Sequence, residues 1–240
     1  MITKLRNLWK QAFGDTDAFL DDFFATGFSP DRCHFLTQDG LLAAALYWFD
    51  CQLDGRKLAY VYAVATDEAF RNRGMCRKLL AETHDRLRAQ GYSGALLVPG
   101  SEDLFRLYEK LGYRICSSVT EYTCSAGTPI PLRPVGRLEY AALRRQHLPA
   151  GGVLQEGATL DFLTRFAEFY AGDGFVLAVT LDGTTAHIHE LLGTADAAGI
   201  VAALGAAQGR VRTPGQDKPF AMYFALNSAP APAYFGLALD

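Results

Sequence analysis

The pattern of hydrophobic and polar positions in the first quarter of the chain predicts two helices followed by a three-stranded meander. Apolar side chains recur at helical spacing over residues 2–13, and Gly14 is a typical stop for this helix. Residues 15–24 have the same spacing, and their aromatic face favours core packing. Asp-Gly pairs at 39–40 and 54–55 then separate three apolar runs, and Asp-Gly supplies the positive φ of a tight hairpin turn.

Strands and helices alternate in the next part of the chain. The third strand of the meander ends at Thr66 and leads, through a short polar turn, into an amphipathic helix that ends near residue 90. The apolar run GALLV at residues 94–98 is typical of a buried strand. Ser101 can cap a further helix, and residues 113–124 indicate one or two more strands.

A segment rich in proline and glycine, SAGTPIPLRPVG, is the best candidate for a domain boundary. Beyond it the order helix, helix, Asp-Gly hairpin, helix, strand repeats that of the first half, although the two halves share little sequence. We therefore predict a first domain at residues 1–124, a connecting segment at 125–136 and a second, smaller lobe at 137–240.

Composition narrows the class of protein. The chain has 240 residues and a net charge of -3, which does not favour a nucleic-acid or membrane partner. Its five cysteines are odd in number and form no CxxC, which indicates reduced thiols and a cytoplasmic location. The N-terminal pattern is an amphipathic helix rather than a secretory signal, and no apolar run reaches the roughly 18 residues that a spanning helix needs.

The junction between the third strand and its helix has the composition of an anion-binding site. A helix N-terminus presents unpaired N–H groups and a partial positive charge, and Gly74 lets a ligand approach the backbone. Positive charge is added by Arg71, Arg73, Arg77 and Lys78. The segment matches neither GxGxxG nor GxxxxGK[ST]. A solvated basic helix start is the alternative, and the loop alone leaves both interpretations open.

The spacing from Arg71 through Gly74 to Cys76 resembles the acyl-coenzyme A loop of the GNAT superfamily of N-acetyltransferases, which reads Gln/Arg-x-x-Gly-x-Gly/Ala. Cys76 departs from this pattern at its last position. The stretch LFRLYEKLGYR, residues 104–114, resembles the second signature of the family, Tyr-x-x-x-Gly-Phe/Tyr, and Tyr108 follows Gly74 by 34 residues, which suits the family. The resemblance covers residues 1–124.

The resemblance implies an α/β (α+β) fold with a mixed, mainly antiparallel central sheet flanked by helices. A second, smaller GNAT-like lobe would follow. Between its hairpin and its helix this lobe has no copy of the Arg-x-x-Gly-x-Gly pattern. We therefore expect a degenerate lobe that binds no coenzyme A and shapes the acceptor site.

The resemblance also implies roles for individual residues. The backbone of the strand end would pair with the pantetheine arm of acetyl-CoA, the loop and first helical turn would hold its pyrophosphate, and Tyr108 would protonate the departing thiolate. Ser101 stands where many relatives carry an Asn that contacts the cofactor, and it is equally a helix N-cap. The residues implied in cofactor binding are Val64, Ala65, Thr66, Arg71, Asn72, Arg73, Gly74, Met75, Cys76, Arg77 and Ser101.

The sequence does not identify the catalytic base. The strand at residues 95–98 carries no acid where some relatives have a Glu. Glu121, Glu190 and the C-terminal carboxylate of Asp240 are candidates, although an ordinary surface or structural role is favoured for each. A base relayed by water, or a substrate that arrives neutral, satisfies the chemistry equally well.

Three aromatic residues and two histidines complete the list of candidates. Tyr60 and Tyr62 lie on one face of a predicted strand and, with Trp48 in the neighbouring strand, are candidates for the acceptor cleft, with core packing as the alternative. His187 and His189 share a strand face but lack a third ligand at convincing spacing, so no metal is predicted.

Together these features predict a cytoplasmic N-acetyltransferase that uses acetyl-CoA as co-substrate and acts by direct attack of a primary amine. The acceptor would be a small molecule or a peptide amine, without a nucleic-acid or membrane partner, and a homodimer is compatible with the sequence. The alternative is a non-catalytic acyl-CoA-binding sensor or scaffold protein.

Overall fold

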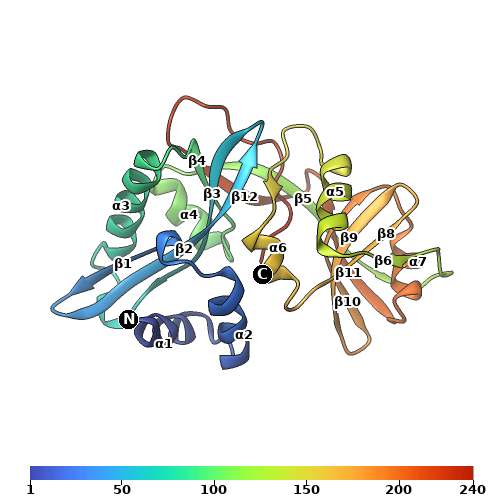
Figure 1. Ribbon diagram of the computed structural model, residues 1–240, viewed down its shortest axis with the longest axis horizontal. Helices are drawn as coiled ribbons and strands as arrows, with labels where there is room; N and C mark the ends of the chain where they lie inside the picture. Colours follow the sequence, from blue (N-terminus) through green and yellow to red (C-terminus); the bar gives the residue numbers. More distant parts are fainter. Residues whose placement is uncertain (240) are drawn as a thin grey trace.

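The computed structural model describes residues 1–239, and the chain begins with helices and a strand meander (Figure 1). The predicted order is confirmed, and its turns have the expected geometry. Gly14 ends the first helix with a φ of 76°, and Asp39 and Asp54 have positive φ at the two hairpins. The elements are α1 (Ile2–Phe13), α2 (Asp17–Asp22), the π-helical turn η1 (Phe23–Gly27), the 3-10 turn η2 (Pro30–Arg32), β1 (Cys33–Gln38), β2 (Leu41–Leu53) and β3 (Arg56–Thr66).

The strand-loop-helix segment follows as the periodicity predicts. Its helix is amphipathic and buries one leucine-rich face, whereas the short strand after it is buried at every position. The elements are the 3-10 turn η3 (Glu68–Phe70), α3 (Met75–Ala89), β4 (Gly94–Leu97), α4 (Glu102–Lys110) and β5 (Arg114–Ser125).

The second half of the chain also alternates between short helices and strands. Its hairpin turns at Gly183-Thr184, one residue later than the predicted Asp-Gly turn, because Asp182 is the last residue of β9 and pairs with Thr185, and Gly183 has a φ of 57°. The elements are β6 (Arg133–Pro134), α5 (Arg137–His147), β7 (Leu154–Gln155), α6 (Ala158–Leu163), β8 (Glu168–Gly172), β9 (Phe175–Asp182), β10 (Thr185–Gly193), α7 (Ala197–Ala203), β11 (Gln208–Pro214) and β12 (Lys218–Ala225).

One sheet runs through both halves of the molecule. Within the described residues the strand order is β1-β2-β3-β4-β12-β5-β11-β10-β9-β8-β6, and β7 pairs with β2 outside this path. The pairs β3–β4 and β10–β11 are parallel, whereas the other pairs are antiparallel. The mixed, mainly antiparallel sheet flanked by helices confirms the predicted fold class.

The last strand of the chain lies inside the first lobe rather than at the end of the second. β12 pairs with β4 on one side, where Met222 is opposite Leu97, and with β5 on the other, where Lys218 is opposite Val119. The side chains of Phe220, Ala221, Met222 and Tyr223 are buried in the cores on the two faces of the sheet. The predicted division into residues 1–124 and 137–240 stays a prediction, and the sheet runs unbroken across it.

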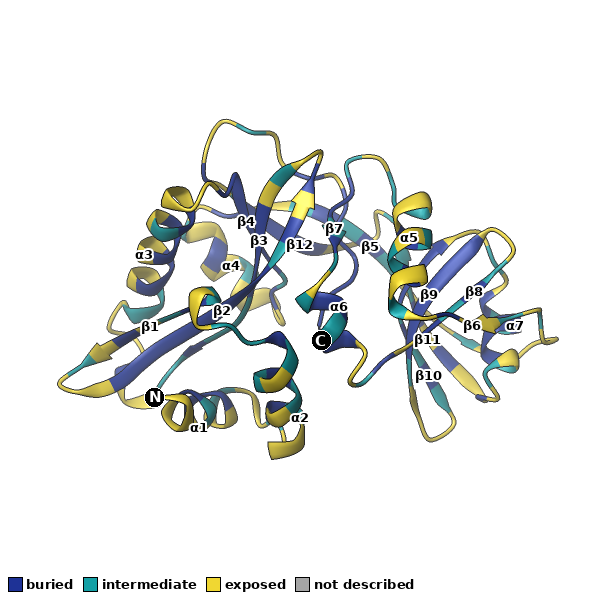
Figure 2. Ribbon diagram, viewed as in Figure 1, coloured by how far each residue is buried: buried dark blue, intermediate teal, exposed yellow. Residues whose placement is uncertain are grey.

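Three groups of buried side chains form the core, and Figure 2 shows them along the strands and the inner faces of the helices. The largest lies between the sheet and the helices α1, α2, α5 and α6. A second fills the opposite face of the first lobe beneath α3 and α4, and a third lies beneath α7. The two faces of the first lobe are therefore covered by different helices, as a sheet with two apolar faces requires.

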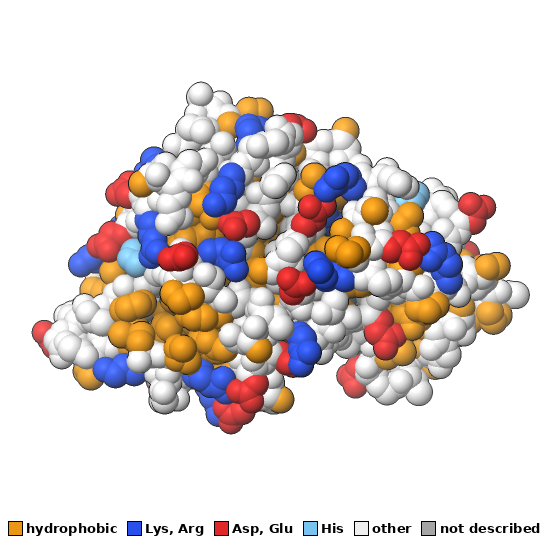
Figure 3. All heavy atoms as spheres, viewed as in Figure 1, with side chains coloured by type: hydrophobic (Ala, Val, Ile, Leu, Met, Phe, Trp, Pro, Cys, Tyr) orange, Lys and Arg blue, Asp and Glu red, His pale blue; other side chains and the backbone are white. Residues whose placement is uncertain are grey.

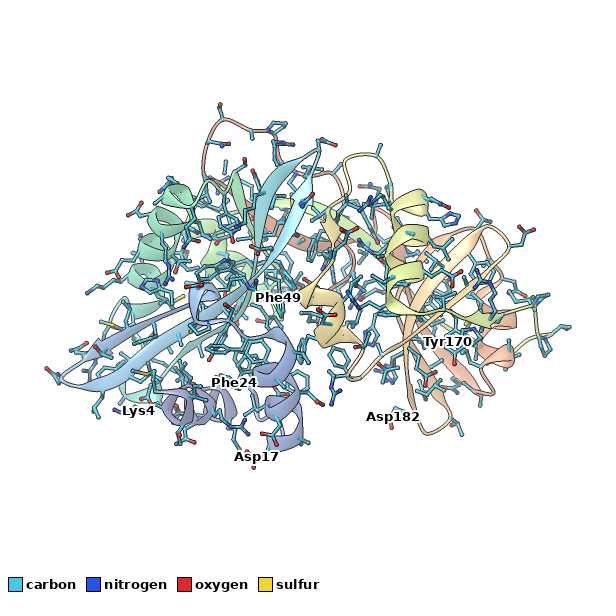
Figure 4. The ribbon with its side chains drawn as sticks, in the orientation of Figure 1. Lys4, Asp17, Phe24, Phe49, Tyr170 and Asp182 are labelled. Atoms are coloured by element: carbon cyan, nitrogen blue, oxygen red, sulfur yellow. The ribbon has the colours of Figure 1, made fainter. Side chains whose placement is uncertain are left out.

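Several contacts join the two halves. Phe49 of β2, labelled in Figure 4, stacks on Phe162 of α6 with 6.2 Å between ring centroids and 12° between the ring planes. The Arg165 guanidinium lies 2.6 Å from the carboxylate of Asp22. Because β7 also pairs with β2, the second half packs directly against the α1–α2 face of the first lobe.

The C-terminal tail, residues 234–239, passes between the lobes and is buried. Tyr234 forms a bridge with Gly152, and the Ser117 hydroxyl donates to the Phe235 carbonyl oxygen at 2.9 Å. Phe235 and Leu237 are fully buried. The tail therefore belongs to the core shared by both lobes.

The surface has a mixed character. In the view of Figure 3, hydrophobic side chains gather over α1 and β2 on the face covered by the first helices. Phe13 and Phe35 are large exposed hydrophobic residues of α1 and β1, with exposed fractions of 47% and 36%. None of the helices within residues 1–239 has the length and apolar character needed to cross a membrane.

Candidate functional site

The strands β3 and β4 pair at their beginnings and then part. Their parallel register joins Leu58 to Gly94 and Tyr60 to Leu96, after which β4 ends at Leu97 while β3 continues to Thr66. On the side of β4, no described strand pairs with β3 beyond Tyr60. The end of β3 therefore keeps an edge of backbone N–H and C=O groups available to a ligand.

A bulge lies in this part of β3, in its pairing with β2. The register between β2 and β3 shifts between Ala45 and Tyr47, and Ala63 has a φ of 49°, which an L-residue with a Cβ seldom adopts. Such a conformation costs about 1–3 kcal/mol and persists because the surrounding sheet imposes it. The bulge changes the direction of the peptide groups that precede Val64, Ala65 and Thr66.

The loop between β3 and α3 is closed by Arg71. Its Nε donates to the Thr66 carbonyl oxygen at 3.3 Å, and its guanidinium lies 3.4 Å from the Glu68 carboxylate. Part of the positive charge predicted for this loop is therefore neutralised within it. Asn72 and Gly74 both have positive φ, of 60° and 76°, which turns the chain sharply into the helix.

The N-terminus of α3 has the features of an anion site. Gly74 is the N-cap residue and offers no side-chain cap, and the Lys78 N–H makes the first intrahelical bond, to the Gly74 carbonyl oxygen. The N–H groups of Met75, Cys76 and Arg77 consequently have no helical partner. A Cβ placed on Gly74 would meet no atom within 4 Å, so the space in front of the helix is open.

Charge surrounds the same point. Arg73 lies over the Phe70 ring with its guanidinium carbon 5.7 Å from the centroid, and the residues from Arg71 to Gly74 are exposed. Lys78 is 3.9 Å from Glu82, a weak surface pair. Exposed guanidinium groups, free N–H groups and the positive end of the α3 dipole together favour a bound anion.

Tyr108 of α4 lies beside this first turn of α3. It is only 7% exposed and packs edge-to-face on Tyr113, with ring centroids 5.7 Å apart. Burial, with a smaller contribution from the neighbouring Cys76 thiol, raises the pKa of Tyr108 well above its ordinary value. The structure thus brings the two predicted signatures together, and it keeps the phenol protonated at neutral pH.

Ser101 has the structural role that the sequence offered as one of two interpretations. It is the N-cap of α4, and its hydroxyl accepts a hydrogen bond from the Leu104 N–H at 3.4 Å. The cap is confirmed, whereas contact with a cofactor stays a prediction.

The three aromatic candidates for the acceptor cleft lie on opposite faces of the sheet. Trp48 is 1% exposed beneath α3, and its Nε1 donates to the Tyr92 hydroxyl at 3.1 Å. It therefore belongs to the core, because β2 turns this residue away from the face that carries Tyr60 and Tyr62. The placement of Trp48 in the acceptor cleft is corrected accordingly.

Tyr60 and Tyr62 face α1 and the C-terminal tail. The Tyr62 hydroxyl donates to the Leu239 carbonyl oxygen at 2.9 Å, and the Tyr60 hydroxyl accepts from the Leu239 N–H at 3.3 Å. Tyr60 is buried, whereas Tyr62 is partly accessible. The tail thus lies directly on the strand that leads into the candidate site.

Two of the candidate bases have other partners. Glu190 is 1% exposed and forms an ion pair with Arg144, with 2.6 Å between Oε2 and Nε. For Glu121, burial raises the pKa, but hydrogen bonds from Lys218 and Arg212 outweigh burial and hold the pKa below its ordinary value, which makes it a weak base. The third candidate, Asp240, lies outside the described residues.

His187 and His189 do not belong to a metal centre in the described structure. Within residues 1–239 no group of three or more His, Cys, Asp or Glu side chains is placed to hold a metal ion. His189 instead forms a hydrogen bond of 2.8 Å with the Thr180 hydroxyl.

Comparison with known proteins agrees with this architecture. Residues 2–116 match the acetyltransferase (GNAT) domain family. The chain resembles a GCN5-related N-acetyltransferase from Kribbella flavida (TM-score 0.71, 16% identity, covering 94% of this chain and 69% of that one). A GCN5-related N-acetyltransferase from Anabaena variabilis gives a TM-score of 0.71 at 16% identity, over 94% and 70% of the two chains.

A tandem GNAT protein from the clavulanic acid biosynthesis pathway matches over nearly the whole of both chains, 95% and 96%, with a TM-score of 0.56 and 12% identity. At these identities the likeness shows a shared fold. No curated protein sequence matches the chain. The chain therefore has a GNAT-like fold, and residues 2–116 in its first lobe carry the match to the acetyltransferase (GNAT) domain family.

The structure adds features that the sequence analysis missed. The bulge at Ala63 has no signal in the sequence, because alanine is common in regular strands. The contact between Cys76 and Tyr108 is long-range, and only the family spacing hinted at it. The tail at Leu239 gave no local pattern beyond its hydrophobicity. The most important feature that the sequence did not indicate is the position of β12. Its apolar run falls within the predicted second lobe, residues 137–240, but the strand pairs with β4 and β5.

Proposed function

We propose that this protein transfers an acetyl group from acetyl-CoA to a primary amine. The observation that carries the proposal is the end of β3, which pairs with β2 but with no described strand on its β4 side, and which leads through a left-handed loop to an uncapped helix N-terminus. The edge at Val64–Thr66 would pair with the pantetheine arm as a neighbouring strand does. The N–H groups after Gly74 would bind the pyrophosphate, with Arg73 and Arg77 supplying positive charge.

The reaction requires three events at the thioester. The neutral amine attacks the carbonyl carbon, forming a C–N bond and placing negative charge on the oxygen. A backbone N–H near Val64, redirected by the bulge, is the donor that we assign to this oxyanion. The C–S bond then breaks, the amine loses its proton to water, and coenzyme A leaves as a thiolate or thiol.

Tyr108 is the residue that we assign to the departing sulfur. Its phenol is protonated throughout the neutral range because burial raises its pKa, so it can donate a hydrogen bond or a proton but cannot act as the base. Its position beside Cys76 places it at the first turn of α3. The acceptor is a small-molecule amine or a peptide amine, and the unpaired thiols of the described cysteines are compatible with a reducing cytoplasm.

The first prediction concerns turnover. Wild-type protein should release coenzyme A from acetyl-CoA in the presence of some member of a panel of primary amines. Tyr108→Phe should lower kcat roughly 10- to 1000-fold, the range of lost acid catalysis, with little change in the Kd for acetyl-CoA. Stopped-flow thiol detection and calorimetry provide the two measurements. Unchanged kcat in Tyr108→Phe, with chemistry shown to be rate-limiting, contradicts the role.

A pH profile gives an independent readout of the same residue. A raised pKa means that the phenol keeps its proton up to a higher pH than a free tyrosine does. As the pH increases, the wild-type rate should therefore rise because the amine deprotonates. No decline of the rate should begin at a pH under about 10, the ordinary tyrosine pKa. The contrary result is a decline of the wild-type rate at about pH 8–9 that disappears in Tyr108→Phe. It would show that the phenol ionises in the working range, well under the ordinary tyrosine pKa.

A non-catalytic acyl-CoA sensor or scaffold is the second candidate. It is favoured by Cys76 at a position where the family pattern has Gly or Ala, and by the partners already engaged by Glu121 and Glu190. A sensor would be stabilised against thermal unfolding by acetyl-CoA and would release no coenzyme A with any amine of the panel.

A further inference from the structure

A polar pocket of about 390 Å³ lies on the sheet of the second lobe, away from the loop at Gly74. Its floor is formed by β5, β11 and β10 and carries few apolar side chains. The polar residues that line it are Glu121, Thr123, His187, His189, Arg210 and Arg212.

Strand register places hydrogen-bond donors of this pocket in one row. Arg210 of β11 is opposite Thr123 of β5 on one side and opposite His187 of β10 on the other. In the neighbouring row, Arg212 is opposite Glu121. Because directly opposed residues of paired strands project their side chains to the same face, the hydroxyl, guanidinium and imidazole groups share one surface.

Among the described residues, the charges that line the pocket do not cancel. Arg212 is engaged: its Nε is 2.9 Å from the Glu121 carboxylate, and its guanidinium carbon lies 4.4 Å from the centroid of the Phe220 ring. Lys218 binds the same carboxylate, so Glu121 has two cationic partners. Arg210 is exposed and forms an ion pair with no carboxylate in the described chain. A spare guanidinium among further donors suits a carboxylate or a phosphate.

The pocket opens on the face of the sheet that carries Tyr60 and Tyr62. Glu121 and Thr123 alternate in phase with Val119, whose side chain belongs to the core on that face. Phe220, which lies under Arg212, is part of the same core and so is Tyr60. The buried tail therefore lies between two exposed regions of one face, the β3 end and the pocket.

Distance decides what kind of ligand can use both regions. Four steps between neighbouring strands separate β3 from β11, which amounts to roughly 19 Å at about 4.8 Å per step. A compact amine cannot reach from the thioester to Arg210. A ligand with an amine at one end and an anionic group at the other can do so if it is extended over a similar length.

We propose that the Arg210 pocket binds a carboxylate or phosphate at the far end of an elongated acceptor whose amine is acetylated near β3. The inference rests on the proposed acetyltransferase function and adds the class of acceptor to it. Arg210 is the specificity-determining residue, with Thr123 and His187 as neighbouring donors. Glu121 also lines the pocket, and its charge is balanced by Arg212 and Lys218.

Peptides with a single amine at the N-terminus serve as a ruler for this test. Extended chains cover about 3.3–3.6 Å per residue, so roughly five or six residues span the required distance. Uncharged peptides of two to seven residues would be compared as C-terminal acids, as C-terminal amides and as amides that end in phosphoserine. The measured quantity is kcat/KM for coenzyme A release by the full-length protein.

We expect the acid or the phosphoserine peptide to exceed the amide about tenfold or more in kcat/KM once the length reaches about five residues, and no difference for dipeptides. Which of the two is preferred identifies the anion. Arg210→Gln should remove the preference by raising KM for the acid and phosphoserine peptides about tenfold or more, to the level of the amides. Arg133→Gln, an exposed arginine of β6 on the same lobe, should retain it.

Equal kcat/KM for charged and amide peptides at every length would overturn the inference, and so would an undiminished preference in Arg210→Gln. If no amine releases coenzyme A, the acetyltransferase function fails instead. The pocket is then judged by fluorescence anisotropy of labelled acid and amide pentapeptides on acetyl-CoA-saturated protein. Tighter binding of the acid that is lost in Arg210→Gln supports the site, and equal binding rejects it.

Discussion

A chain that ends at Ser125 will not give a soluble, folded first lobe, because it lacks the strand that completes its sheet. β12 supplies the neighbour of both β4 and β5, and without it each has an open edge. The same cut removes α6 from the aromatic core around Phe49, and it removes the tail that covers Tyr60. Expression and gel filtration of residues 1–125 should therefore show insoluble or aggregated material.

A complementation experiment shows whether the 1–125 fragment is insoluble because it lacks the contacts of the second half or because its chain is short. Co-expression of residues 1–125 with residues 126–240 should recover a soluble complex, since Ser125 and Ala126 are exposed and the break leaves every strand present. The complex should bind acetyl-CoA as the intact chain does. A soluble 1–125 fragment that alone has full activity on the acceptor would show that the second lobe contributes nothing to folding or catalysis.

Arg144→Met should destabilise the protein by about 3–5 kcal/mol, a fall in Tm of roughly 6–20 °C for a chain of this size. The Arg144 guanidinium makes two bonds to the Glu190 carboxylate, of 2.6 and 3.0 Å, and both side chains are at most 2% exposed. Removal of the cation leaves a buried carboxylate without its counter-charge, which is the costly case. Differential scanning calorimetry measures the effect.

The adjacent arginine is a matched control. Arg145 follows Arg144 on α5, but its side chain is 60% exposed and pairs with Glu156 on the surface. Arg145→Met should therefore cost about 0–1 kcal/mol. The double variant Arg144→Met/Glu190→Leu should recover much of the lost stability, because no charge is then left buried. Equal losses in Arg144→Met and Arg145→Met would contradict this account of the ion pair.

The ion pair also explains how the second lobe holds the tail. Arg144 donates to the Val153 carbonyl oxygen at 3.2 Å, and Tyr234 donates to Glu190 at 3.0 Å. The amide of Gln155 donates to the Leu237 carbonyl oxygen at 2.7 Å. These bonds fix the tail on both sides of Phe235, and the tail in turn contacts β3. Loss of the Arg144–Glu190 ion pair should therefore disturb the tail and the part of β3 that it contacts before it disturbs the loop that precedes α3.

The local features of the fold could be predicted from the sequence because each rests on a few neighbouring residues. Asp39-Gly40 and Asp54-Gly55 supply the backbone conformation of their turns, whatever surrounds them. The apolar face of α3 and the cap at Ser101 are likewise fixed by spacing and by one side chain. The loop at Gly74 was indicated by the spacing from Arg71 to Cys76, whereas its left-handed conformation, with a φ of 76° at Gly74, was not predicted.

The long-range features could not be predicted in this way. The apolar run of β12 is typical of a buried strand, but nothing in it indicates that β4 and β5 are its neighbours. Trp48 lies in a strand that is apolar on both faces, so alternation did not show which face it occupies. Glu121 looked like a free carboxylate because its partners, Arg212 and Lys218, come 91 and 97 residues later in the chain.

The central claim is that the first lobe alone carries one acetyl-CoA site at the N-terminus of α3. Calorimetric titration with acetyl-CoA tests it most directly, using wild type, Gly74→Asp and Gly91→Asp. Gly91 is the matched control: it follows the other end of α3, has a φ of 79° against 76° for Gly74, and a Cβ added there likewise meets no atom within 4 Å. We predict one site per chain in wild type and in Gly91→Asp, and greatly weakened binding in Gly74→Asp, where a carboxylate enters the pyrophosphate position. Two sites per chain, or equal affinity in Gly74→Asp and wild type, would contradict the account.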